Sequence, residues 1–254
     1  MAIFIDDFSS YSLNTQPTSN WTVINGTNDE GDEIESNAEA AGGQVFRKYN
    51  PSNSKPEWSP NAVDSEDVAI KIRFYPRNVA GTSRTVILKA YCQASSTRGV
   101  TATFRYSGSV LTVTITNSGG GSTVINTSAH TFTEGAWHIA ELIVFGAGGV
   151  SDPLQIKARC YQEGAPIPAY ATASSTSTVD TTSKLVAFTV GNSDADAETD
   201  FDYFQVLTNG DQPTLDSDEN GQGQFDNLDQ GQCYQFTLQH PDENCDPQVL
   251  QLTF

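Results

Sequence analysis

The chain has 254 residues, enough for one large β-sandwich or two small domains. It carries 31 Asp and Glu residues against 13 Lys and Arg residues, so its formal net charge is −18. Such an acidic surface repels nucleic-acid phosphates, and no apolar run is long enough to cross a bilayer, so we expect neither nucleic-acid binding nor membrane insertion.

The first quarter of the chain predicts short strands separated by long loops. Residues 3–8 read as a first strand, and residues 20–24 form a second candidate around Trp21. Residues 26–43 are acidic and rich in glycine, and residues 50–62 contain three prolines, so both stretches are predicted to be loops. Residues 44–49 return to strand character between these two loops.

The middle of the chain shows the strongest strand signals. Apolar and polar residues alternate in residues 67–75, and a Ser-Gly pair at 107–108 predicts a hairpin turn between two further strands. Predicted strands cover residues 67–75, 85–93, 100–106, 109–116, 122–127, 137–145, 154–161, 184–190 and 200–207. The Ser- and Thr-rich residues 171–183 are expected to be exposed. This pattern predicts an all-β fold, a two-sheet antiparallel jelly-roll sandwich.

The composition changes near residue 208, where Asp, Asn, Gln and Gly become frequent. We therefore predict two parts: residues 1–208 as the sandwich, and residues 209–254 as an acidic linker with a small β-hairpin. The hairpin strands are expected at residues 233–239 and 249–254. A segment this short can form an extension but hardly an independent core.

The four cysteines leave their redox state open. Cys92 and Cys160 lie in predicted strands, whereas Cys233 and Cys245 flank the predicted hairpin. Four cysteines allow three pairings, and four reduced thiols are an equal alternative.

Four segments carry a resemblance to a known family. They are the opening Phe-Ile-Asp-Asp-Phe-Ser at residues 4–9 followed by Trp21, the Gly-Ala-Trp-His run at 135–138, residues 154–161 followed by Gly164, and residues 200–206. In order and spacing the set resembles the concanavalin A-like lectin/glucanase superfamily, specifically its laminin-G-like jelly rolls, over residues 3–207. The resemblance implies that the last strand pairs beside the first. The superfamily includes lectins, glycan-binding modules, glycosidases, lyases and virion proteins, so the fold does not determine the function.

Residues 30–35 contain the carboxylates that a catalytic site would need. Glu30, Asp32 and Glu35 fit the bare E-x-D-x-x-E spacing of the retaining glucanases in this superfamily, which need two close carboxylates in a groove. The run lies early, in a charged loop, and its intervening residues are not the apolar ones of the family. His138, at a strand start, reads as a half-exposed strand residue rather than a base. We therefore assign no catalytic residue and expect no enzymatic activity.

Calcium is the cofactor that the acidic residues suggest, at two candidate sites. The first matches the start of a D-x-[DN]-x-[DN]-G loop, whose alternate oxygen ligands can converge on one cation. Its residues are Asp216, Asp218, Asn220 and Asp226. The second would form if the first and last strands pair, and its residues are Asp6, Asp7, Asp200 and Asp202. The alternatives are an acidic linker at the first site and carboxylates that face water at the second.

Exposed aromatic rings could stack on sugars. The residues proposed for this role are Trp58, Tyr49, Tyr106 and Tyr170, whereas Trp21 and Trp137 are expected in the core. The leading functional hypothesis is a non-enzymatic structural or adhesion protein of a virus particle, for phage capsid decoration or tail attachment. It rests on the initial Met1 without a visible signal peptide, the acidic surface, the jelly roll and the trailing extension. The alternatives are a secreted lectin-like module and, third, a glycoside hydrolase or polysaccharide lyase. The expected location is the virion or the extracellular space, with other virion proteins, copies of the chain or a glycan as partners.

Overall fold

The computed structural model of the chain describes residues 2–26, 32–49, 56–61, 63, 67–77, 84–94, 98–117, 120–127, 133–146, 148–179, 184–191, 198–208, 233–238 and 248–253. It divides into two compact units, Ala2–Gly210 and Asp211–Phe254, the second together with Met1.

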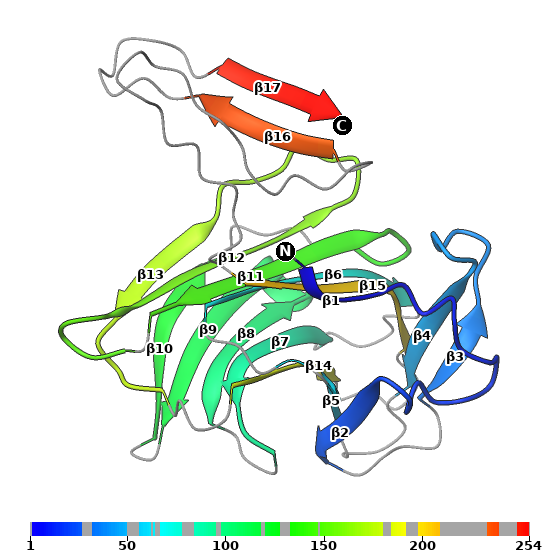
Figure 1. The fold of residues 1–254 in the computed structure, drawn as a ribbon, viewed down its shortest axis with the longest axis horizontal. Helices are drawn as coiled ribbons and strands as arrows, with labels where there is room; N and C mark the ends of the chain where they lie inside the picture. The colour runs from blue at the N-terminus through cyan, green and yellow to red at the C-terminus, as the bar shows by residue number, and fades with distance from the viewer. Residues whose placement is uncertain are drawn as a thin grey trace. The chain divides into compact units, whose positions relative to one another are not determined.

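The larger unit is a sandwich of two antiparallel sheets (Figure 1). Apart from one turn of 3-10 helix at Ser107–Ser109, its described elements are all strands, which confirms the predicted all-β fold. The eight-stranded sheet contains β1 (Ala2–Asp6), β3 (Glu33–Ser36), β4 (Gln44–Tyr49), β6 (Val68–Arg77), β11 (His138–Phe145), β12 (Leu154–Gln162), β13 (Ala171–Ser175) and β15 (Glu198–Thr208). The seven-stranded sheet contains β2 (Trp21–Asn25), β5 (Glu57–Pro60), β7 (Thr85–Cys92), β8 (Gly99–Arg105), β9 (Val110–Asn117), β10 (Gly120–Thr127) and β14 (Leu185–Gly191).

The strand orders show how distant parts of the chain meet. The eight-stranded sheet runs β13-β12-β11-β6-β15-β4-β3, with β1 paired to β15, and the seven-stranded sheet runs β10-β9-β8-β7-β14-β5-β2. Ile5 of β1 lies opposite Gln205 of β15, so the first and last strands of the sandwich pair side by side, as predicted.

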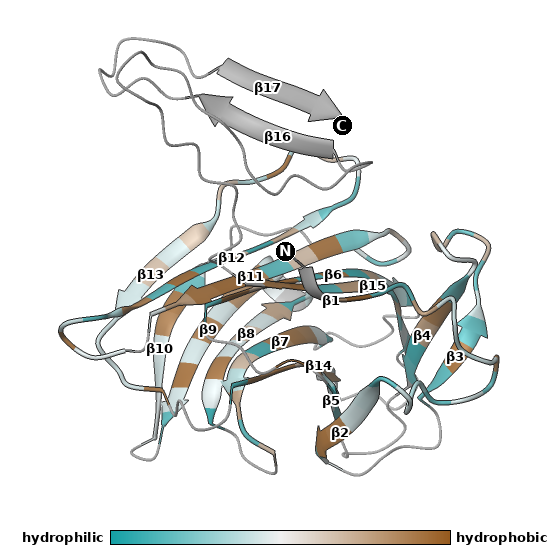
Figure 2. Cartoon of the chain, in the orientation of Figure 1, coloured by the Kyte–Doolittle hydropathy of each residue, from teal (hydrophilic) through white to brown (hydrophobic). Residues whose placement is uncertain are grey.

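The core lies between the two sheets because each strand turns alternate residues inward. In β6 the inward residues are Val68, Ile70, Ile72 and Phe74, all of which belong to the core cluster. Figure 2 shows the same alternation of apolar and polar residues along β8 and β9. The residues between these core positions therefore point away from the opposite sheet.

Trp21 anchors the aromatic part of this core. Its ring meets Phe4 edge-on at 5.2 Å between centroids, Phe188 at 5.3 Å and Phe204 at 5.0 Å. Such edge-to-face contacts add to the stabilisation that burial alone supplies. Because Phe4 and Phe204 come from the paired strands β1 and β15, this cluster also joins the two ends of the sandwich.

Two strands, β3 and β5, lie where loops were expected, and the prediction was wrong at both, while a third strand, β13, lies in the segment that was expected only to be exposed. Strand β3 has one apolar residue, Ile34, which enters the core; β5 ends on a proline; and β13 is a Ser- and Thr-rich edge strand. Short strands with so little alternation form because neighbouring strands pair with them, and this pairing is not visible in local sequence.

The smaller unit contains an antiparallel pair, β16 (Cys233–Leu238) and β17 (Gln248–Thr253). Phe236 lies opposite Leu250 in this pair. The predicted C-terminal hairpin is therefore present.

Two further predictions concern cysteines and membranes. Cys92 and Cys160 are buried and form no disulfide among the described residues, while the pairing of Cys233 and Cys245 lies outside what the structure describes. No helix in the described ranges is long and apolar enough to span a membrane.

Candidate functional site

The side of the eight-stranded sheet that points away from the second sheet, called here the outward face, carries rows of aromatic and charged side chains. The first row crosses β12, β11, β6 and β15. In strand register, Arg159 lies opposite Glu141, Glu141 beside Lys71, and Lys71 beside Gln205. Tyr170, just before β13, closes this row against Arg159. Neighbouring strands are about 4.8 Å apart, so these side chains lie within contact range of one another.

Glu141 organises the first row. Its Oε2 accepts hydrogen bonds from Arg159 Nε and from the Tyr170 hydroxyl, both at 2.6 Å, and its Oε1 accepts one from Tyr161 at 3.4 Å. The Arg159 guanidinium lies 3.9 Å from the centroid of the Tyr170 ring, within cation–π range. Each of these side chains is held in place by at least two others.

The two tyrosines of this cluster stay protonated over a wide pH range. Burial, and then the nearby Glu141 carboxylate, raise the pKa of Tyr161 to about 12. Burial and the hydrogen bond to Glu141 also raise the pKa of Tyr170. Neither phenol is suited to act as a base at neutral pH, whereas both remain hydrogen-bond donors.

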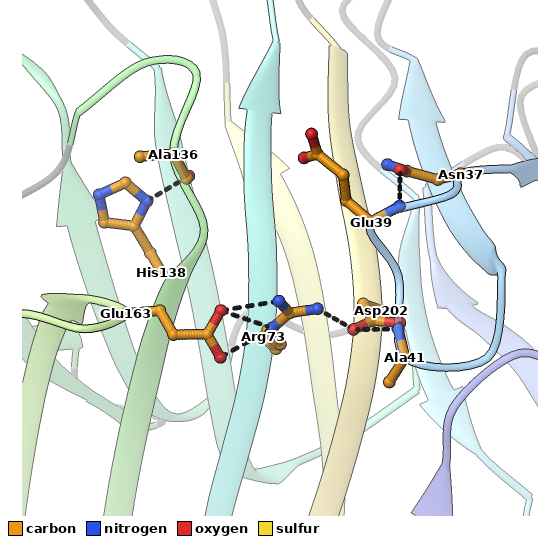
Figure 3. Close-up of polar contacts among 8 residues, drawn as sticks. All are labelled: Asn37, Glu39, Ala41, Arg73, Ala136, His138, Glu163 and Asp202. Carbon is orange, nitrogen blue, oxygen red and sulfur yellow. Dashed lines mark hydrogen bonds and ion pairs between the residues drawn. The ribbon is translucent and has the colours of Figure 1, made fainter.

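Arg73 organises the second row, on β6 (Figure 3). Its Nε and Nη2 donate to the Glu163 carboxylate at 3.1 Å and 2.7 Å, and its Nη1 contacts Asp202. The guanidinium also lies 3.9 Å from the centroid of the Trp137 ring. Figure 3 shows Arg73 between the two carboxylates, one from each side.

Asp202 is fully buried beneath Arg73. It accepts a hydrogen bond from the Ala41 backbone N–H at 3.0 Å. Burial raises the pKa of Asp202, and the hydrogen bonds from Ala41 and Arg73 offset this only in part. A carboxylate this enclosed holds Arg73 in position rather than contacting solutes.

Asp200 occupies a third cluster, where two arginines meet. It accepts hydrogen bonds from Arg47 Nε at 2.7 Å, Arg77 Nε at 2.5 Å and Asn37 Nδ2 at 3.2 Å. The guanidinium groups thus occupy the carboxylate oxygens that the sequence suggested for a cation.

The first-strand aspartates of that predicted site also have protein partners. Asp6 accepts from the Phe8 backbone N–H at 2.8 Å and from Trp21 Nε1 at 2.7 Å, and Asp7 accepts from Ser9. Strand register places Asp6 opposite Phe204, away from Asp200. Among the described residues, no group of three or more His, Cys, Asp or Glu side chains is arranged to hold a metal ion. The other predicted site, at Asp216, Asp218, Asn220 and Asp226, lies outside the described residues.

Of the aromatic residues proposed to contact sugars, the structure places one on the outward face. Tyr170 is there, whereas Trp58 is fully buried and donates its indole N–H to Asp32 at 2.9 Å. Tyr106 is half-buried and packs against the core, and the side chain of Tyr49 lies outside what is described. Trp137 was expected in the core, but it lies half-buried on the outward face, where it contacts Arg73. Alternation along the strand could have revealed this position. His138 begins β11 and points into the core, so the preceding Trp137 points to the opposite side.

The acidic motif and the histidine also have structural partners. Asp32 is buried and pairs with Lys48 Nζ at 2.7 Å, Glu35 lies 3.7 Å from Arg47, and Glu30 is outside the described residues. His138, expected to be half-exposed, is fully buried: Nδ1 lies 2.8 Å from the Ala136 carbonyl, and Nε2 accepts from the Thr133 N–H at 3.0 Å. Both ring nitrogens are engaged, so this histidine is not placed to act as a base.

Comparisons with known proteins give fold neighbours only. No protein-family model and no curated protein sequence matches the chain. Among solved structures, the carbohydrate esterase of the Shiga toxin-encoding bacteriophage phi24B shares 15% identity at a TM-score of 0.51, covering 82% of this chain and 99% of that one. A protein of unknown function from Shewanella oneidensis MR-1 shares 11% at 0.50, covering 80% and 84%. The carbohydrate-binding module CBM66 of Bacillus subtilis shares 12% at 0.48, covering 74% and 96%.

These neighbours correct one expectation and support another. The expectation of no enzymatic activity is overturned, because proteins with this fold include enzymes, among them the phage esterase. Identities this low show the fold alone, and that fold is the predicted jelly-roll sandwich. The bacteriophage carbohydrate esterase is among the neighbours that share it.

Proposed function

We propose that this chain recognises a carbohydrate and binds it on the outward face of the eight-stranded sheet. The observation that carries the proposal is the first row, in which Tyr170, Arg159, Glu141, Lys71 and Gln205 succeed one another across neighbouring strands. Aromatic rings can stack on the apolar face of a sugar, while planar charged groups and amides bind its hydroxyls. The row combines both kinds of group.

Preorganisation supports the proposal. The contacts of Glu141 with Arg159, Tyr170 and Tyr161 hold the row in one arrangement before any ligand arrives. A site already ordered loses less side-chain entropy on binding, so weak individual contacts can yield useful affinity. The Arg73–Trp137 contact extends the same arrangement by one row.

The test is glycan binding by the full chain and by matched variants. We expect Tyr170→Ala and Gln205→Ala each to weaken binding by about tenfold, because each removes a contact worth about 1–2 kcal/mol. Thr114→Ala is the control, since Thr114 lies on β9 of the other sheet, between the core residues Val113 and Ile115. Glycan arrays followed by calorimetry give the affinities, and thermal melting confirms that each variant is folded.

Two outcomes would contradict the proposal. The unmodified chain could bind no glycan on a broad array, or both site variants could bind as tightly as the unmodified chain. The release of acetate, reducing ends or unsaturated sugars in the same incubations would show that the chain also acts on what it binds.

A second proposal concerns location: the chain is an external component of a virus particle. It rests on the acidic composition and the C-terminal extension of the chain, and one solved structure with a similar fold comes from a bacteriophage. Glycan recognition would suit such a protein, because many copies on one particle convert weak binding into avidity. Mass spectrometry of purified virus particles from the source lysate should find the chain as a stoichiometric component, and its absence there would end this proposal.

The calcium prediction at Asp216, Asp218, Asn220 and Asp226 also stays a proposal. Calcium should raise the melting temperature of the chain relative to a chelator, because a cation that binds the folded state stabilises it. The double variant Asp216→Ala, Asp218→Ala should lose this response, and equal melting temperatures with calcium and chelator would contradict it.

A further inference from the structure

The cationic residues of this acidic chain are concentrated on the outward face. The sequence has 13 Lys and Arg residues in all. Six of them lie on strands β4, β6 and β12 at positions that alternate with core residues, and therefore point outward: Arg47, Lys71, Arg73, Arg77, Lys157 and Arg159. Nearly half of the positive charge thus lies on one side of one sheet.

Most of these cations are neutralised by neighbouring carboxylates, but two are not. Arg47 and Arg77 pair with Asp200, Arg73 pairs with Glu163 and Asp202, and Arg159 pairs with Glu141. Within the described part of the chain, Lys71 and Lys157 form no ion pair. Lys71 is next to Glu141 in register, yet the oxygens of Glu141 are already bound by Arg159, Tyr170 and Tyr161.

The two lysines lie on either side of the same strand, and both belong to the proposed sugar-binding surface. Lys71 is on β6 and is a member of the first row, between Glu141 and Gln205. Lys157 is on β12, beside Ile143 of β11 and two residues from Arg159. Two strand spacings separate β6 from β12, about 10 Å, so one bound polymer could contact both ammonium groups.

The described strands β8 and β9 of the opposite sheet present a largely uncharged surface. The outward positions of β8 and β9 are mostly threonines, Thr101, Thr103, Thr112, Thr114 and Thr116, which form uncharged cross-strand pairs such as Thr101 with Thr114, and the cation among them is the guanidinium of Arg105 at the end of β8. Lys89 on the neighbouring β7 is buried and pairs with Glu57. Among these described strands, lysines without an ion-pair partner therefore lie on the outward face of the eight-stranded sheet.

We infer that the ligand of this face is an acidic polysaccharide, one whose sugars carry carboxylate or sulfate groups, and that Lys71 and Lys157 bind these anionic groups. This inference rests on the proposed carbohydrate binding and adds the class of sugar. A neutral glycan has no group that needs an ammonium partner, whereas an anionic substituent forms charge-assisted hydrogen bonds with one. The net charge of −18 repels anionic polymers elsewhere on the molecule, so binding must depend on these local contacts.

The experiment uses the full chain and two matched pairs of polymers. Polygalacturonate is compared with its methyl ester, which removes the carboxylate charge, and dextran sulfate with dextran, which separates the sulfate source from the carboxylate source. Calorimetry should show binding to at least one charged polymer about tenfold tighter than to its neutral counterpart. The pair that shows the difference identifies the anionic group.

Charge-removing variants test the two lysines. Lys71→Met and Lys157→Met keep most of the side-chain length, and each should weaken binding to the charged polymer about tenfold without changing binding to the neutral one. Arg105→Met is the control, because Arg105 is exposed on β8 of the other sheet and its loss changes the net charge equally. Lys71→Arg, which keeps the positive charge, should bind the charged polymer about as tightly as the unmodified chain does.

The outcomes separate the inference from the proposal on which it rests. Equal affinity for charged and neutral polymers would overturn the acidic ligand but leave carbohydrate binding standing. Weakening by Arg105→Met as large as that by Lys71→Met would also overturn it, because a general charge effect would then be responsible. Binding to no polymer in these pairs and to no glycan on the array would overturn both.

Discussion

Lys48 and Asp32 form an ion pair inside the sandwich, with 1% and 0% of their side chains exposed. Asp32 also accepts the indole N–H of Trp58, and Lys48 donates to the Pro56 carbonyl at 3.1 Å. Removing charges from water is costly, and these hydrogen bonds offset the cost only while both partners are present. Each side chain therefore depends on the other.

We predict that Lys48→Met destabilises the chain by about 3–5 kcal/mol, because Asp32 is left buried without its partner. The double variant Lys48→Met, Asp32→Leu should recover a large part of this loss, since it removes both charges. Urea unfolding of the three proteins measures the free energies. A loss below 1 kcal/mol in Lys48→Met would show that the pair is not needed.

At the scale of elements, β15 positions much of the outward face. It pairs with β6 along one edge and with both β1 and β4 along the other. The register against β6 shifts between Phe201 and Tyr203, so two residues, Asp202 and Tyr203, separate the core residues Phe201 and Phe204. This bulge sets where Asp202 meets Arg73.

Strand β8 begins at a glycine that the packing requires. Gly99 has φ of +126°, and a Cβ there would lie 2.8 Å from the Ala90 carbonyl oxygen and 2.9 Å from that of Tyr91. Gly120, at the start of β10, has a similar φ of +114° but nothing within 4 Å of its Cβ position. The two glycines share a backbone conformation with positive φ, but only at Gly99 would an added Cβ contact neighbouring atoms.

We predict that Gly99→Ala lowers the free energy of unfolding more than Gly120→Ala, by about 1–3 kcal/mol. Both variants carry the same kind of backbone strain, so the difference reports the clash with β7. Chemical denaturation of the two variants side by side provides the measurement. Equal losses would mean that β7 yields to the added methyl group without cost.

At the scale of the whole molecule, charge is unevenly distributed along the chain. Residues 209–254 contain nine of the 31 acidic residues and none of the 13 basic ones, so they account for −9 of the net −18. Residues 1–208 therefore carry 22 acidic and 13 basic residues, a net of −9. The sandwich is less acidic than the average suggests, so the ammonium groups of Lys71 and Lys157 face less repulsion of an anionic ligand from the sandwich itself.

The free energy of unfolding should decrease at alkaline pH, because buried thiols and phenols in several parts of the sandwich have raised pKa values. Burial raises the pKa of Cys92 from 9.0 to about 12 and that of Tyr161 from 10.0 to about 12, and burial also raises the pKa values of Cys160, Tyr170 and Tyr203. Above pH 9 the unfolded chain loses these protons first and binds fewer than the folded chain, so the free energy of unfolding decreases. The stabilisation is complete below about pH 9 and is lost progressively toward about pH 12.

Urea midpoints at several pH values from 8 to 11 test this expectation, with circular dichroism as the probe. Cys92→Ala should show a shallower decline across this window, although its midpoint at pH 8 is lower because of the cavity. A midpoint independent of pH up to 11 would contradict the prediction.

The sequence by itself determined the all-β class, most strand positions and the C-terminal hairpin. Alternation of apolar and polar residues is a local property, so strands such as β6 are readable from their own residues. The resemblance of residues 4–9 and 200–206 to a known family added the pairing of β1 with β15. Short strands such as β3 and β5 were not predicted, because they form by pairing with neighbouring strands and their own residues show little alternation.

Only the tertiary structure decided the site. Trp137 lies on the outward face and not in the core, because a shift of one residue in the phase of a strand moves a side chain to the other face. Trp58, which was expected to be exposed in a loop, is buried because residues 57–60 pair as a strand with β2 and β14. Asp200 and Asp202 meet arginines from β4 and β6, and the first row joins residues from Lys71 to Gln205. These neighbours follow from the register between strands far apart in the chain, which non-local packing sets and no single stretch of sequence contains.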